Sequence, residues 1–126
     1  MTKFNNVVLI AAVGNNGQIG LKGNLPWHNP ADLEFFKTTT SGHVVLVGKH
    51  TYASLPKLPN RLVYVQSRDK TLDYYVYMRD KHYPAKTLFI AGGTTIYELW
   101  KPFVSRSIIS HIDYNGEADT FMPHLW

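Results

Sequence analysis

QIGLKGNLPWHNPADLEFFK, which runs from Gln18 to Lys37, is the stretch around which the rest of the chain is organised. It begins as a flexible glycine-rich loop, turns through a rigid Leu-Pro-Trp corner and continues as a short amphipathic helix. Asn29 and Pro30 fit the N-cap and N1 positions of that helix, where Asn and Pro are favoured. The pattern therefore predicts a helix that starts at Pro30 and carries Asp32 in its first turn, at position N3.

Asp32 has two interpretations. In the first, it completes a capping box and interacts with the positive end of the helix dipole, as first-turn acids commonly do. In the second, it is held in an apolar cleft, where it binds a cationic or proton-accepting ring. The apolar neighbours that would form such a cleft are Leu25, Trp27, Leu33, Phe35 and Phe36. The local pattern alone favours the first interpretation.

Length and composition indicate one globular domain that covers residues 1–126. Hydrophobic residues make up 44% of the chain and charged residues 17%, which are globular values without a bias towards disorder. There is no cysteine and the histidines form no metal-spaced cluster, so we expect neither a disulfide nor a bound metal. The longest apolar run, Val7 to Val13, is too short for a bilayer, and the N-terminus lacks signal-peptide features. We therefore expect a cytoplasmic protein without a membrane partner.

The charge of the chain favours anionic ligands of small size. The formal net charge is +4, but the basic residues are scattered along the sequence and form no block. This distribution indicates small phosphorylated ligands rather than nucleic acid.

Apolar segments predict a single-domain α/β fold with a mixed, mainly parallel central sheet and flanking helices. The segments with strand character are Val7–Val13, His43–Val47, Leu62–Gln66, Thr87–Ala91 and Ser107–Ile112. Thr71–Met78 is expected to form a short outer strand, and the polar segment Arg79–Ala85 leaves little room for a long crossover helix.

Two glycine turns join strands to helices in a way that suits phosphate. Gly48 precedes a short helix at Lys49–Ser54, and Gly92–Gly93 precedes a helix that opens at Thr94 and Thr95. A helix N-terminus after such a turn offers free amides and a positive dipole to an anion. Each signal is modest alone, because many such turns bind nothing and the GxGxxG spacing is absent.

Taken in order, the motifs of the chain resemble those of the dihydrofolate reductase family. They are AAVGNNGQIGLKGNLPW with PADLEFFK, VGKHTYASLP, LPNR, AGGTTIY, and SHID with EADTFMP, and they cover about Val7 to Pro123. The resemblance implies NADPH-dependent reduction of dihydrofolate to tetrahydrofolate, with hydride delivered to C6 and a proton to N5. A related pterin or pyrimidine reductase and a degenerate binding or structural homologue are the alternatives. The presence of Asp32, Arg61, Gly92 and Gly93 argues against a degenerate homologue.

The resemblance implies roles for residues on the substrate side. Asp32 resembles the carboxylate that hydrogen-bonds the pterin ring, Trp27 the aromatic residue that anchors a water beside it, and Ser110 stands where Thr is usual. Arg61 resembles the arginine that clamps the glutamate α-carboxylate of the substrate. The residues that resemble the apolar walls around the substrate are Ala12, Leu33, Phe36, Leu55 and Leu58.

Further roles follow on the cofactor side. Ala12, Ile19 and Tyr97 resemble the nicotinamide contacts. The residues that resemble the two parts of a pyrophosphate cradle are Gly48, Lys49, His50, Thr51, Gly92, Gly93, Thr94 and Thr95. Lys49, Ser67 and Arg68 resemble the residues that read the 2′-phosphate of NADPH.

Two departures from the family pattern lead to further expectations. The family continues past FMP into a β-hairpin, so here the edge at Ser107–Ile112 is expected to be uncovered. We expect a homodimer through that edge, or a C-terminal tail folded over it, and favour the dimer because Pro123 suits a strand poorly. The short segment between Arg68 and Phe89 predicts that the crossover helix of the adenosine-binding part is trimmed or lost.

Overall fold

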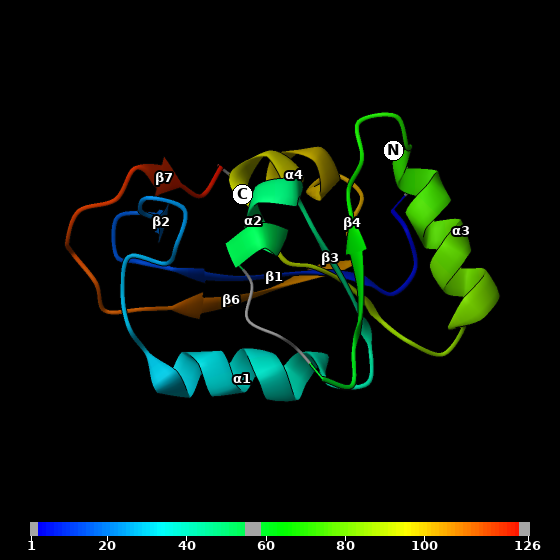
Figure 1. The fold of residues 1–126 in the computed structure, drawn as a ribbon, viewed down its shortest axis with the longest axis horizontal. Helices are drawn as coiled ribbons and strands as arrows, with labels where there is room; N and C mark the ends of the chain where they lie inside the picture. Colours follow the sequence, from blue (N-terminus) through cyan, green and yellow to red (C-terminus); the bar gives the residue numbers. More distant parts are fainter. Residues whose placement is uncertain (1–2, 55–58, 124–126) are drawn as a thin grey trace.

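A parallel β-sheet forms the centre of the protein (Figure 1). The computed structural model describes residues 3–54 and 59–123. Within them, five strands form one sheet in the order β4-β3-β5-β1-β6, and β2 and β7 pair separately. The strands are β1 (Val7–Val13), β2 (Gln18–Gly20), β3 (Val44–Val47), β4 (Leu62–Val65), β5 (Leu88–Ile90), β6 (Arg106–His111) and β7 (Thr120–Phe121). The helices are α1 (Pro30–Thr40), α2 (Lys49–Ser54), α3 (Leu72–His82) and α4 (Thr94–Trp100).

The predicted fold class is confirmed, since helices flank a mainly parallel sheet. Every pairing within the five-stranded sheet is parallel, and the pairing of β2 with β7 is antiparallel. Strand β1 lies between β5 and β6, and its register sets Ala12 beside Ser110. The carboxyl ends of all five parallel strands therefore meet at one edge, where open α/β sheets bind ligands.

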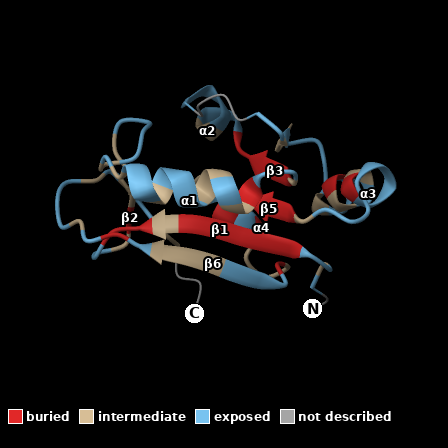
Figure 2. Cartoon of the chain, turned by 90° about the horizontal axis from the view of Figure 1, so that it is seen from below, coloured by how far each residue is buried: buried red, intermediate tan, exposed pale blue. Residues whose placement is uncertain are grey.

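The sheet is buried on both faces by different helices. Alternate residues of β1 point to opposite faces, and Val7 and Leu9 join a cluster that includes Trp100 of α4 and Tyr75 of α3. On the other face, Val8 and its neighbours pack against Phe36 of α1. Figure 2 shows burial concentrated on β1, β3 and β5, whereas β6 is less covered. A run such as VVLIAAV is continuously apolar because neither of its faces meets water.

Helix α1 begins as the sequence predicts. Asn29 is the N-cap, its side-chain oxygen accepts from the backbone N–H of Asp32 at 3.0 Å, and Pro30 is the first helical residue. At the other end, Thr40 is fully buried, and its hydroxyl donates to the carbonyl of Phe36 at 2.8 Å. The cap and the proline thus fix the helix start, and with it the position of Asp32.

The prediction of an outer strand at Thr71–Met78 was wrong, because this segment lies in helix α3. The side chain of Thr71 caps the helix by accepting from the N–H of Tyr74 at 3.2 Å. Tyr75 and Arg79, one helical turn apart, are both buried against the body of the protein. Helix α3 makes the crossover from β4 to β5. Of the two predicted alternatives, a trimmed or a lost crossover helix, the loss was therefore wrong, and trimming stays a prediction.

The buried Arg79 explains how a polar helix is held on the sheet. Its guanidinium donates to the carbonyls of Asn5, Asn6 and Lys86 at 2.8, 2.8 and 2.9 Å, and also bonds Asp80. These bonds satisfy a charge that would otherwise be costly to bury. They tie α3 to the chain that enters β1 and to the chain that enters β5.

The glycine-rich loop after β1 is more ordered than the sequence indicates. It contains β2, which pairs with β7 from the opposite end of the sequence. Gln18 is buried, and its side-chain oxygen accepts from the N–H of Asn16 while its amide donates to the carbonyl of Gly116. The loop is thereby attached to residues that lie about a hundred positions further along the chain.

Strand β6 forms one edge of the five-stranded sheet. Arg106, Ser107 and His111 on this strand are exposed. Association of two copies through this edge stays a prediction, which sedimentation at micromolar concentration tests. In the part of the chain that the structure describes, no helix is both long and apolar enough to cross a bilayer.

Candidate active site

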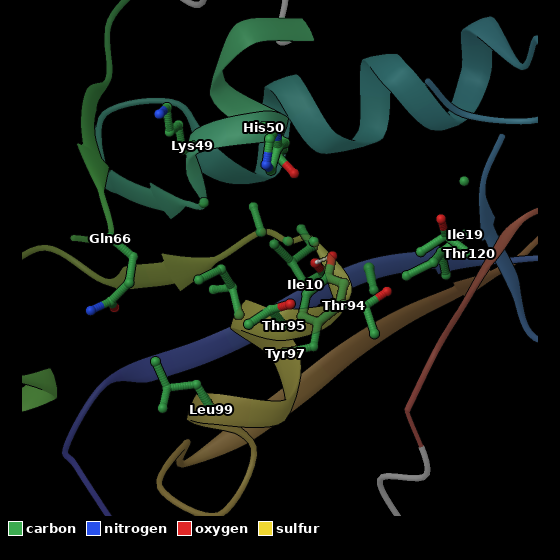
Figure 3. Close-up of a pocket in the computed structure, with 18 of the residues that line it drawn as sticks. Ile10, Ile19, Lys49, His50, Gln66, Thr94, Thr95, Tyr97, Leu99 and Thr120 are labelled. Carbon is green, nitrogen blue, oxygen red and sulfur yellow. Dashed lines mark hydrogen bonds between the residues drawn. The ribbon is translucent and has the colours of Figure 1, made fainter. Parts of the chain in front are cut away.

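A cavity of about 2190 Å³ lies at the carboxyl ends of the parallel strands. Sites for one drug-sized ligand are usually about 300–1,000 Å³, so this cavity has room for a substrate and a coenzyme together. Its lining extends from Ser110 on β6 to Arg68 just after β4. Strands β6 and β4 are the two edges of the sheet. Four strand spacings of about 4.8 Å make it roughly 19 Å wide. Figure 3 shows Ile19 and Thr120 at one end of this cavity and Gln66 at the other.

The cavity brings together nearly all the residues predicted for the two ligands. Those that line it are Ala12, Ile19, Trp27, Asp32, Leu33, Phe36, Gly48, Lys49, His50, Thr51, Ser67, Arg68, Gly92, Gly93, Thr94, Thr95, Tyr97 and Ser110. They come from strands β1, β2 and β6, from α1 and the loop that precedes it, and from the turns after β3, β4 and β5 with the helices α2 and α4. Leu55 and Leu58 lie outside the described residues, and Arg61 does not line this cavity.

Helix α1 places one carboxylate in an otherwise apolar wall. Asp32 is half-buried beside Leu33, Phe36 and Trp27, and the Trp27 ring lies 5.5 Å from that of Tyr114. The helix is capped by the side chain of Asn29, and within the described residues the Asp32 carboxylate makes no hydrogen bond or ion pair. A capping box would have used this carboxylate, so the geometry leaves it available to a ligand.

The two glycine turns lie against each other on the cavity wall. The N–H of Gly48 donates to the carbonyl of Gly92 at 2.8 Å. A Cβ atom on Gly48 would lie 2.9 Å from the side chain of Ile96, and Gly92 has a φ of +113°. Neither position accepts a side chain without a shift of its neighbours. The peptide between Gly92 and Gly93 is cis.

Tyr97 holds the turn at Gly92 and Gly93 in place. Its hydroxyl donates to the carbonyl of Ile10 at 2.8 Å, and a Cβ on Gly92 would lie 3.3 Å from the Tyr97 hydroxyl oxygen. Burial raises the pKa of Tyr97 well above its usual value, so the hydroxyl stays protonated. Tyr97 thus holds α4 and the Gly92 turn against β1. Figure 3 shows Lys49 and His50 of α2 facing Thr94 and Thr95 of α4 across the cavity.

One end of the cavity is closed by the glycine-rich loop. Asp119 accepts hydrogen bonds from the N–H of Lys22 and from the hydroxyl of Thr120, both at 2.9 Å. These two bonds hold the pKa of Asp119 below its usual value, and the bond from the Lys22 amide has the larger effect. The N–H of Asp119 also donates to the carbonyl of Gly20 at 3.0 Å. Asp119 therefore keeps the loop that carries Ile19 against the cavity.

The other end is closed by the polar turn that joins β4 to α3. Ser67, Arg68 and Lys70 of this turn line the cavity. Gln66 also lines it, and its side-chain oxygen accepts from the indole N–H of Trp100 at 3.0 Å. Among the described residues that line this end, the cations Lys49, Arg68 and Lys70 outnumber the acid Asp73, as suits a phosphorylated ligand.

Arg61 is bonded to the protein at the end of α1. Its Nε donates to the hydroxyl of Thr40 at 2.7 Å, and its other two nitrogens donate to the carbonyls of Pro59 and Lys37. Three of its five N–H donors are thus used, which leaves two for a ligand. Arg61 lines a separate hollow with His43 and Lys86. Its part in substrate binding stays a prediction.

Sequence reasoning missed several residues of the cavity wall. They include Gln66, Lys70, Thr71, Leu72, Asp73, Leu99, Phe103 and Thr120. Those between Thr71 and Asp73 belong to the start of α3. A capping Thr71 with Asp73 in the first turn, and Arg79 and Lys81 in the last turn, were signals for a helix that could have placed them. The position of Thr120 depends on the pairing of β7 with β2, for which the local sequence carries no signal.

Comparison with known proteins identifies the family. Residues 6–126 match the model of the dihydrofolate reductase family. A dihydromethanopterin reductase of Methylorubrum extorquens is 30% identical over 132 residues, which cover 96% of this chain and 93% of that protein. A dihydrofolate reductase of Haloferax volcanii is 33% identical over 135 residues, covering 92% of this chain and 70% of that protein. Dihydrofolate reductase from Enterococcus faecalis, solved in complex with NADP(H) and RAB-propyl, superimposes with a TM-score of 0.84 at 27% identity, covering 99% of this chain and 81% of that one.

The chain thus shares the fold of the Enterococcus faecalis reductase and has a cavity at the carboxyl ends of its parallel strands. The chain belongs to the dihydrofolate reductase family of oxidoreductases.

Proposed function

We propose that this protein reduces dihydrofolate to tetrahydrofolate with NADPH. The observation that carries the proposal is the Asp32 carboxylate, which lines the same cavity as both glycine turns and bonds no described residue. A carboxylate so placed is free to hold a pterin ring, while the rest of the cavity accommodates a coenzyme. The match to the dihydrofolate reductase family supports the same reaction.

The residues on the cofactor side fit a dinucleotide phosphate. Gly48 and Gly92 let the backbone approach a ligand closely, since a side chain at either position would meet Ile96 or Tyr97. Lys49 and Arg68 are both exposed on the cavity rim and supply positive charge. Lys49, Ser67 and Arg68 would hold the 2′-phosphate of NADPH, and the amides of Thr94 and Thr95 the pyrophosphate. When bound, NADPH supplies the hydride that is delivered to C6 of the substrate.

Asp32 has the central part in the mechanism. Its carboxylate hydrogen-bonds the pterin ring and promotes protonation at N5, which makes C6 a better hydride acceptor. Trp27 anchors a water molecule beside the carboxylate and excludes others from the ring. Ala12 and Ser110 are direct neighbours in the register of β1 and β6, and they form the sheet side of the same subsite. An electrostatic effect is strong here because the surrounding wall is apolar.

Arg61 binds the glutamate α-carboxylate of the substrate in this proposal. The hydrogen bonds to Thr40, Pro59 and Lys37 fix the guanidinium before the substrate arrives. Its two remaining N–H donors are then oriented for a carboxylate at low entropic cost. The substrate would lie along α1, with its ring at Asp32 and its carboxylate at the far end of the helix.

A second candidate is reduction of dihydromethanopterin. The reductase of Methylorubrum extorquens aligns with nearly the whole of both chains at 30% identity. Asp32 and the cofactor side would serve this pterin in the same way, because both substrates carry a reducible pterin ring. The difference between the two candidates lies in what binds at the Arg61 end of α1.

The experiment measures NADPH oxidation with dihydrofolate and with dihydromethanopterin, using wild type, Asp32→Asn and Glu34→Gln. Glu34 is an exposed acid on the same helix, so it controls for the loss of one charge. We expect activity with dihydrofolate, a fall in turnover of at least ~100-fold for Asp32→Asn and little change for Glu34→Gln. Activity with dihydromethanopterin alone would select the second candidate. Near-native activity of Asp32→Asn at neutral pH would remove Asp32 from the mechanism.

A further inference from the structure

The turn between β4 and α3 is held in one conformation by hydrogen bonds. The backbone N–H of Ser67 donates to the hydroxyl of Tyr75 at 2.7 Å, and that hydroxyl donates to the carbonyl of Val65 at 3.0 Å. The side-chain amide of Gln66 donates to the carbonyls of Ser67 and Lys70, each at 3.2 Å. The side chains of this turn are therefore presented to the cavity by a fixed backbone rather than by a loose loop.

A carboxylate occupies this turn among the basic residues. The hydroxyl of Ser67 donates to Oδ1 of Asp69 in a short hydrogen bond. That bond, together with the backbone amide of Asp69, holds the pKa of Asp69 below its usual value, so the group is ionised at neutral pH. One of the neighbouring cations, Lys70, lies over the Tyr74 ring with its Nζ 4.8 Å from the ring centroid. Arg68 remains as the exposed cation between Ser67 and Asp69.

This arrangement affects a phosphate and a hydroxyl in opposite ways. A phosphate at the turn has to compete with Asp69 for the Ser67 hydroxyl, and it is repelled by the negative charge of that carboxylate. A ribose hydroxyl carries no charge, so the carboxylate behind Ser67 does not repel it. In dinucleotide sites generally, an acidic residue on the ribose favours NAD and an arginine favours NADP. Arg68 and Asp69 place both kinds of residue side by side.

We propose that Asp69 is a specificity-determining residue that lowers the preference of this protein for the 2′-phosphate, so that it uses NADH as well as NADPH. The inference rests on the proposed function, because it assigns this turn to the adenosine ribose of the coenzyme. Arg68 and Lys49 attract the 2′-phosphate, and Asp69 opposes them by repulsion and by occupying the Ser67 hydroxyl. The preference for NADPH is the balance of these effects.

The experiment compares binding of adenosine 2′,5′-bisphosphate and of 5′-AMP to the full chain by calorimetry, with NADPH and NADH titrated in parallel. Asp69→Asn removes the charge, Asp69→Ala removes the acceptor as well, and Glu98→Gln is the control. Asp69 does not itself line the cavity but bonds Ser67, which does, whereas Glu98 is an exposed acid on α4 whose side chain bonds no described residue. Glu98→Gln therefore makes the same change in net charge without touching the turn. Circular dichroism verifies that all variants are folded.

We expect wild type to bind NADPH no more than about tenfold more tightly than NADH. Asp69→Asn and Asp69→Ala should each widen the ratio of the two dissociation constants by about three- to tenfold, through tighter binding of the 2′-phosphorylated ligands. Glu98→Gln should leave the ratio unchanged. An unchanged ratio in both Asp69 variants, or an equal widening in Glu98→Gln, overturns the inference while reduction of dihydrofolate still supports the proposed function. Failure of wild type to bind any of the four ligands overturns both.

Discussion

Each end of the cavity is closed by a segment that carries or bonds an exposed aspartate, but the two aspartates bond to very different parts of the chain. At the loop end, Asp119 accepts from the N–H of Lys22, which is 97 positions away in the sequence. At the turn end, Asp69 accepts from the hydroxyl of Ser67, which is two positions away. The hydrogen bonds that each aspartate accepts hold its pKa below the usual value. The same chemistry thus serves a tertiary clamp at one end and a local turn at the other.

The difference shows what each end depends on. The Asp119 bond exists only when β7 lies beside β2, a pairing supported by the bond from the Met122 N–H to the Gly17 carbonyl at 2.8 Å. The Ser67–Asp69 bond forms within one turn of the chain. The loop end is therefore sensitive to the global fold, and the turn end is set mainly by its own sequence. Changes at the first should alter turnover, and changes at the second should alter ligand choice.

Of the changes at the two ends of the cavity, Asp119→Ala is expected to have the largest effect. The Lys22 amide and the Thr120 hydroxyl lose their acceptor, and the loop that carries Ile19 and Trp27 loses one of the bonds that attach it. Because small misplacements of active-site groups are costly, we expect turnover to fall about 10- to 100-fold. Steady-state reduction of dihydrofolate measures this effect.

The matched control for that variant is Glu117→Gln, an exposed acid in the same segment. It should retain wild-type turnover. Equal losses in Asp119→Ala and Glu117→Gln would mean that the charge of the segment matters rather than the clamp. An unchanged turnover in Asp119→Ala would show that the loop is held without Asp119.

Much of the fold was predictable because the information is local. The run VVLIAAV predicts a strand buried on both faces, and Asn29 with Pro30 predicts the start of α1 to the residue. Both glycine turns lie on the wall of one cavity, since parallel strands bring their carboxyl ends together. Their part in binding a phosphate stays a prediction. These features follow from periodicity, caps and topology rather than from specific long-range contacts.

The features that were missed depend on tertiary contacts or on competing local preferences. Tyr74, Tyr75, Val76 and Tyr77 favour a strand by propensity, yet burial of Tyr75 and Arg79 on one face selects a helix. The pairing of β2 with β7 joins distant segments of two and three residues, which are too short to show a strand pattern. The bonds of Arg61 to Lys37 and Thr40 likewise appear only when α1 and β4 are packed.

A smaller effect, confined to ligand choice, is expected at the turn end. Replacing Lys49 and Arg68 together by Gln removes two exposed cations from the cavity rim. We expect NADPH binding to weaken by about tenfold and NADH binding to change by less than about twofold, because only the 2′-phosphate loses its partners. Fluorescence titration of both coenzymes measures the two constants. Equal weakening of both would show that these residues hold the pyrophosphate instead.

The smallest effect concerns stability in acid, and it separates the two aspartates most directly. A carboxylate whose pKa is lowered in the folded protein binds fewer protons there than in the unfolded chain, so its contribution to stability is present above the unfolded pKa. That contribution is lost as the pH falls below about 4 and passes through the lowered folded pKa. The Ser67–Asp69 bond is local and forms in part in the unfolded chain too, whereas the Asp119–Lys22 bond does not. We measure the free energy of unfolding in urea between pH 3 and pH 6. As the pH falls, this free energy should decrease less in Asp119→Asn than in Asp69→Asn. An equal decrease in both variants would show that the local turn depends on the fold as strongly as the clamp does.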